Sequence, residues 1–84
     1  MTIFVANFDS ETEEQDLKVL FENFGTVNDV HIARDWRTGE PLSYAFVEMP
    51  FDGEAEYAIE KLDGKRWSGR RLKVSEKQEG RREY

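Results

Sequence analysis

The stretch LSYAFVEM, residues 42–49, decides the fold of this sequence. Every second side chain of a β-strand points to the same face of a sheet, so alternation separates a buried face from an exposed one. The small and apolar residues at alternate positions are expected to face a core, and they are Ala45, Val47 and Met49. Tyr44 and Phe46 lie between them and are expected to face outward. Aromatic rings on the solvent face of a strand predict an interaction surface.

A second stretch, TIFVANF at residues 2–8, shows the same alternation. Its β-branched and aromatic residues are typical of a strand. Ile3 and Val5 are expected to point inward, which turns Phe4 outward. Three aromatic rings on two strands would then share one face of the sheet. Planar rings in this position can stack on nucleic-acid bases, at about 1–3 kcal/mol per base.

The segments around these two stretches predict two helices and two further strands. Thr12 and Gln15 have the spacing of a capping box and indicate where the first helix begins. The apolar stripe of this helix repeats at helical spacing and consists of Leu17, Leu20, Phe21 and Phe24. The stripe of the second helix consists of Ala55, Ala58, Ile59 and Leu62. The two further strands are marked by Val30 with Ile32 and by Leu72 with Val74.

This order of elements is βαββαβ. It predicts an α+β fold, the ferredoxin-like sandwich, in which a four-stranded antiparallel sheet carries two helices on one face and leaves the other face open. Residues 1–77 are expected to form one domain. Residues 78–84 are polar and charged and show no periodicity, so we expect a flexible tail there.

The composition excludes several classes of function. The chain has no cysteine and one histidine, which excludes disulfides, thiolate zinc sites and cysteine nucleophiles. The sequence also lacks a nucleophile–base pair and a phosphate-cradling glycine loop, so we expect no enzyme, no metal and no cofactor. No apolar run approaches the roughly 20 residues that span a bilayer. We expect an intracellular monomer without membrane contact, cytoplasmic if bacterial, with nucleus or organelle left open.

The charge of the chain is distributed unevenly. The formal net charge is −6, from 12 basic and 18 acidic side chains. Residues 1–60 hold 3 basic and 14 acidic side chains, and residues 61–84 hold 9 basic and 4 acidic ones. Phosphate backbones attract Lys and Arg and repel carboxylates. Any nucleic acid is therefore expected to use the C-terminal end of the domain for its backbone contacts.

Both aromatic stretches resemble motifs of the RNA-recognition-motif (RRM) family. IFVANF at Ile3–Phe8 is similar to the hexapeptide motif of that family, and LSYAFVEM at Leu42–Met49 is similar to its octapeptide motif. The resemblance extends from residue 2 to about residue 77. It implies a domain that binds single-stranded RNA without chemistry on it. Phe4 and Tyr44 would each stack on a base, and Phe46 would contact sugars or lie between neighbouring nucleotides.

The octapeptide departs from the family pattern at its first two positions. Leu42 stands where the family usually has Lys or Arg, and Ser43 stands where it usually has Gly. A phosphate contact is therefore expected to be missing, which lowers the expected affinity. The alternative function is an RRM-like module that binds a protein partner and has little affinity for RNA. Single-stranded DNA is a further candidate ligand.

Five other residues complete the predicted RNA-binding set. Arg71, Lys73 and Lys77 follow the open side of the last strand and are expected to contact phosphates. His31 is expected on the open face of an edge strand, where it would contact a base or remain solvated. Trp36 lies in the loop after that strand and would clamp a nucleotide or pack against its own loop. Trp67, by contrast, is predicted to pack against the core.

Overall fold

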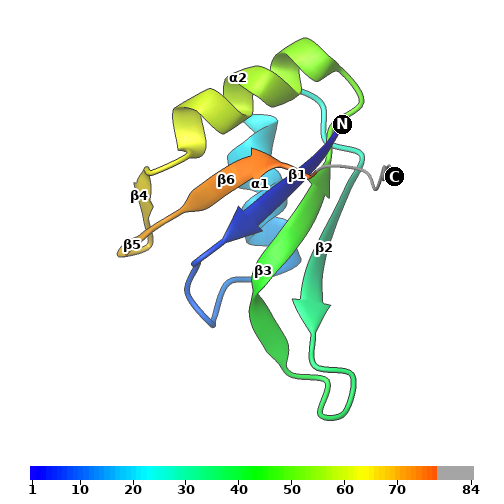
Figure 1. Ribbon diagram of the computed structural model, residues 1–84, viewed down its shortest axis with the longest axis vertical. Coiled ribbons are helices and arrows are strands. Elements are labelled where there is room, and N and C mark those ends of the chain that lie inside the picture. The colour runs from blue at the N-terminus through cyan, green and yellow to red at the C-terminus, as the bar shows by residue number, and fades with distance from the viewer. Residues whose placement is uncertain (78–84) are drawn as a thin grey trace, which may run out of the picture.

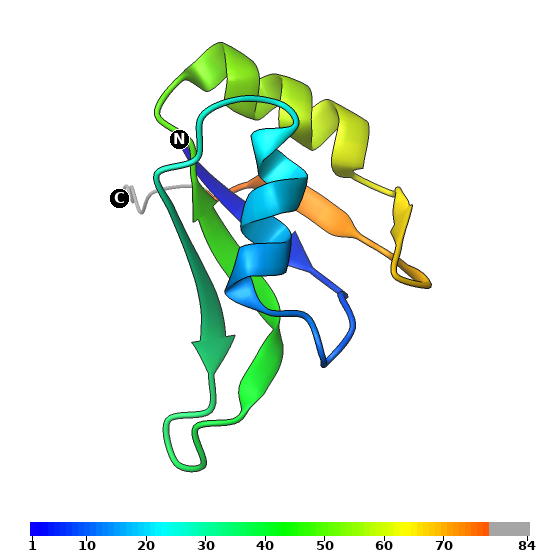
Figure 2. The same ribbon diagram turned by 180° about the vertical axis from the view of Figure 1, so that it is seen from behind.

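A four-stranded antiparallel sheet forms the front of the molecule (Figure 1). The computed structural model describes residues 1–77, and the predicted tail, residues 78–84, lies outside the described residues. The strands of this sheet stand in the order β2-β3-β1-β6, with β2 at Asp29–Arg34, β3 at Pro41–Glu48, β1 at Thr2–Ala6 and β6 at Lys73–Glu76. Helices α1 (Glu14–Glu22) and α2 (Asp52–Leu62) both cover the rear face (Figure 2). The predicted ferredoxin-like βαββαβ fold is confirmed.

The core lies between the sheet and the two helices. Ile3 and Val5 of β1 are fully buried, as are Val47 of β3 and Met49 directly after it. The helices contribute the buried residues Leu17, Phe21, Ala55, Ala58 and Leu62. Among the described residues no polar or charged side chain is buried. The apolar set that alternation predicted is therefore the set that faces the helices, which leaves the intervening side chains on the open face.

Helix α1 begins later than its capping-box prediction. Thr12 lies in a turn, where its N–H donates to the carbonyl of Asp9 (2.9 Å). The N-cap is Glu13, whose N–H donates to the Asp16 carboxylate (3.0 Å). The Thr12 and Gln15 prediction was wrong by one residue, because Glu13 and Asp16 form the capping box and the Thr12 N–H is already bonded to Asp9.

The stretch before β6 forms a small second sheet. Strands β4 (Arg66–Trp67) and β5 (Arg70–Arg71) pair antiparallel. Between them Ser68 and Gly69 have φ values of 52° and 83°. Two central residues with positive φ are the mark of a type I′ turn, whose twist suits a two-residue hairpin. Trp67 is partly buried against the core, as predicted.

Asn7 ends strand β1 and joins it to this hairpin. Its φ of 69° takes the chain out of the strand one residue before the buried Phe8. The Asn7 Nδ2 donates to the carbonyl of Arg71 (2.8 Å), and its Oδ1 accepts from Arg70 (3.2 Å). The hairpin is thereby fixed to the end of the central strand. Neither described helix is long and apolar enough to cross a membrane.

Candidate nucleic-acid interface

Three aromatic rings form a compact group on the open face. Phe4 pairs in register with Phe46, and the next outward position of β1, Ala6, pairs with Tyr44. The ring centroids of Phe4 lie 5.8 Å from Tyr44 and 5.9 Å from Phe46, and those of Tyr44 and Phe46 lie 5.9 Å apart. Phe4 and Phe46 are half-buried and Tyr44 is 37% exposed. The rings are held by one another and by the sheet, while part of their surface remains open to a ligand.

His31 lies beside this group. It pairs in register with Phe46, so both side chains point to the same face. Its side chain is 72% exposed, and its Nδ1 lies 4.0 Å from Glu14 Oε2 at the edge of the sheet. The imidazole is therefore accessible next to an aromatic ring.

Two of the three predicted phosphate contacts share the open face with the rings. Lys73 is exposed and pairs with Ala6. Lys77 donates its N–H to the carbonyl of Thr2 (2.8 Å), and its Nζ lies 5.8 Å from the ring centroid of Phe46. An ammonium group at this distance from a ring makes a cation–π contact. The basic side of the rings is thus the β6 side.

Arg71 is placed differently. It belongs to the hairpin, opposite Arg66, and its Nη1 donates to the carbonyl of Gly64 (3.0 Å). The sequence predicted that Arg71 would face the same open side as Lys73. The guanidinium of Arg71 has a partner within the hairpin region, and its role as a phosphate contact stays a prediction.

Trp36 lies apart from the rings, in the loop between β2 and β3. It is 90% exposed, so it does not pack against its own loop. The only ring contact that the described residues give it is from Arg37, whose guanidinium carbon lies 5.9 Å from the ring centroid. The indole is open to solvent next to a cation.

Two carboxylates on the open face were missed by the sequence reading. Glu48 lies between the buried Val47 and Met49, and it pairs in register with both Asp29 and Thr2. The Thr2 hydroxyl donates to the Glu48 carboxylate. The alternation in residues 42–49 could have placed Glu48 outward, but the pairing of Asp29 required the register. This row of the sheet is therefore acidic at β2 and β3 and basic at Lys77.

Metal chemistry has no visible support at this face. Within residues 1–77, no group of three or more His, Asp or Glu side chains is arranged to hold an ion. The open face instead combines rings, cations and carboxylates, which is chemistry suited to stacking and electrostatic contact.

Comparison with known proteins identifies the family. The family model "RNA recognition motif" matches residues 3–73. A relative from Nostoc sp. (strain PCC 7120), named "Putative RNA-binding protein RbpA", is 43% identical over 75 residues, which are 89% of this chain and 74% of the relative. A solved structure titled "Crystal Structure of RNA Binding Protein PG1" has a TM-score of 0.91 at 34% identity, over 98% of this chain and 99% of that chain. Another, titled "SXL-LETHAL PROTEIN/RNA COMPLEX", has a TM-score of 0.87 at 32% identity, over 94% and 47%. Because the family model covers most of its length, this chain belongs to the RNA recognition motif family.

Proposed function

We propose that the protein binds single-stranded RNA on the open face of its four-stranded sheet. The observation that carries the proposal is the group of three partly exposed rings, Phe4, Tyr44 and Phe46, with centroids 5.8–5.9 Å apart. Bases stack on such rings without regard to sequence, because every base has a π-face. Family membership and the names of the relatives support the same proposal.

Each part of the site has a role in this proposal. Phe4 and Tyr44 stack on one base each, and Phe46 contacts the sugars between them. Lys73 and Lys77 contact phosphates on the β6 side, where the described side chains offer positive charge. About two to four nucleotides are expected on the sheet. His31 contacts a base beside Phe46, whereas Trp36 and Arg71 are peripheral contacts that need RNA beyond this stretch.

The affinity is expected to be low to moderate. Leu42 is 38% exposed and carries no charge where a cation would meet phosphate. Asp29 and Glu48 add negative charge to the same face. The electrostatic contribution to binding is therefore weak for a nucleic-acid-binding domain, and stacking must supply most of the binding free energy. We propose that residues 1–77 act as one monomeric domain and that single-stranded DNA binds the same rings.

A titration followed by NMR tests the proposal. Amide and indole signals of the labelled protein are recorded while short random-sequence RNA oligomers are added, first at low and then at moderate salt. Shifts are expected at Phe4, His31, Tyr44, Phe46 and Lys77, with binding that weakens modestly as salt rises. If nothing moves at millimolar RNA, or only the helices respond, RNA binding on the sheet is refuted. The alternative, a module for a protein partner, would then be favoured.

A further inference from the structure

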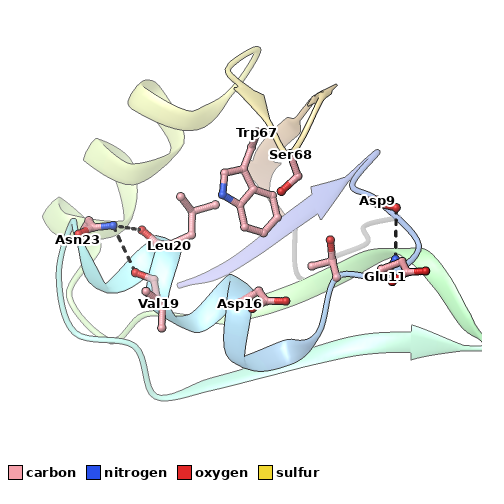
Figure 3. Close-up of a pocket in the computed structure, with 9 residues that line it drawn as sticks. Asp9, Glu11, Asp16, Val19, Leu20, Asn23, Trp67 and Ser68 are labelled. Atoms are coloured by element: carbon pink, nitrogen blue, oxygen red, sulfur yellow. Dashed lines mark hydrogen bonds between the residues drawn. The ribbon is translucent and has the colours of Figure 1, made fainter.

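A groove of about 520 Å³ lies beside α1, away from the aromatic face (Figure 3). The loop after β1, helix α1 and the β4–β5 hairpin line it, and Figure 3 shows the Trp67 indole between the hairpin and α1, next to Leu20. Its lining residues are Asp9, Glu11, Thr12, Asp16, Val19, Leu20, Asn23, Trp67 and Ser68. None of the proposed RNA contacts is among them.

The floor of the groove is apolar. Leu20 and Trp67 are partly buried and pack against the core. Val19 is 52% exposed, although it is a large apolar residue on a helix. One aliphatic or aromatic side chain of a ligand would cover this surface and bury apolar area on both molecules.

The rim of the groove is acidic. Asp9, Glu11 and Asp16 supply three carboxylates, and no Lys, Arg or His among the described residues lines the groove. Asp9 and Asp16 accept backbone N–H groups, from Glu11 (3.3 Å) and Glu13 (3.0 Å), which fixes their positions. Within residues 1–77 none of the three forms a salt bridge. Their negative charge is therefore available to a ligand.

We propose that this groove binds a basic segment of a partner protein. An apolar side chain of that segment lies against Val19 and Trp67, and flanking Arg or Lys side chains pair with Asp9, Glu11 and Asp16. Charge complementarity decides the kind of partner, because the same carboxylates repel phosphate groups and acidic peptides. The groove lies on the helix side of the sheet, so the partner and RNA can bind together. The proposal does not depend on RNA binding.

A designed peptide tests the proposal on the whole chain. The probe is acetyl-Arg-Lys-Leu-Lys-Arg-amide. Two matched peptides replace its leucine by serine, or its four cations by glutamate. NMR titration is expected to give saturable shifts at Val19, Leu20 and the Trp67 indole with the probe, weaker binding with the serine peptide, and none with the glutamate peptide. The Trp36 indole, which lies outside the groove, is the internal control.

Three protein variants distinguish binding in the groove from general attraction to the acidic surface. Glu11→Gln removes one rim charge and is expected to weaken binding of the probe about 1.5- to fivefold, the range for an exposed ion pair. Val19→Ser removes the exposed apolar contact at little cost in helix propensity, and a loss of similar size is expected. Glu56→Gln removes the same charge from the exposed surface of α2, outside the groove, and is expected to change binding less than 1.5-fold.

Two results would overturn the proposal. Shifts that fail to saturate, or that spread over the acidic surface with equal effects of Glu11→Gln and Glu56→Gln, would mean general charge attraction only. Shifts at the aromatic rings in place of the groove would also refute it. A chain that binds the probe in the groove but no RNA would support this inference and refute the proposed function, so the two failures are distinguishable.

Discussion

Replacement of Tyr44 by alanine is the sharpest test of the stacking surface. Tyr44 is 37% exposed, and its ring lies 5.8 Å from Phe4 and 5.9 Å from Phe46, centroid to centroid. The substitution removes one of three rings and leaves the apolar core on the other face intact. Removal of a stacked ring costs about 1–3 kcal/mol per base, so the Kd for short RNA should rise roughly five- to 150-fold.

The chain offers a matched control on the opposite face. Tyr57 of α2 is 50% exposed and packs edge-on against Phe24, with ring centroids 5.6 Å apart. Tyr57→Ala makes the same chemical change on the helix side and should leave the Kd within about twofold of the unchanged protein. Tyr44→Phe keeps a ring and should retain most of the affinity.

Fluorescence anisotropy of a labelled random-sequence RNA oligomer gives the Kd values of the unchanged protein and of the three variants at low salt, and circular dichroism checks that each variant is folded. Stacking on Tyr44 is refuted if Tyr44→Ala binds as tightly as the unchanged protein. It is also refuted if Tyr44→Ala and Tyr57→Ala weaken binding equally, because the loss would then not depend on the open face.

Three further predictions concern charges on the open face and the contact between Gly25 and helix α2. Glu48→Gln removes a carboxylate from the open face and should tighten RNA binding roughly twofold at low salt, an effect on the scale of one exposed charge pair; weaker binding in the anisotropy assay would contradict this. Replacing both Lys73 and Lys77 by alanine should reduce the slope of log K against log salt by about 1.4, since each phosphate contact contributes about 0.7 on single strands. An unchanged slope would show that these two lysines do not contact phosphates. Gly25→Ala would bring a Cβ to 2.2 Å from Glu54 Oε1 and 2.6 Å from Glu54 Cβ. The free energy of unfolding, measured by thermal denaturation, should therefore fall by about 1–3 kcal/mol. An unchanged Tm would show that the Glu54 side chain moves aside without cost.

Alternation in the sequence predicted correctly which side chains of β1 and β3 face the core and which face outward. Period-two spacing placed Phe4, Tyr44 and Phe46 outward and Ile3 with Val47 inward, because each choice is fixed by the one buried face of a strand. The roles of the outward residues in RNA binding stay predictions, since no ligand contact is described.

Features that depend on partners distant in sequence were predicted less well. The guanidinium of Arg71 bonds to Gly64, a contact that exists only because the hairpin folds back. Asp29 joins the acidic row through its register with Glu48, which no local pattern encodes. The start of α1 was misplaced because Thr12 and Glu13 are both followed, three residues later, by a polar side chain that can complete a capping box.

The central place of β1 in the sheet has a consequence for synthesis of the protein. β1 comes first in the chain, yet its neighbours are β3 and β6, so Thr2 pairs with Glu48 and Ile3 with Glu76. At about 5–20 residues per second, a nascent β1 spends several seconds without either neighbour. The four-stranded sheet is complete only after β6 has left the ribosome. We expect a nascent chain that ends before β6 to remain protease-sensitive, and folding to follow release of the last strand in one cooperative step.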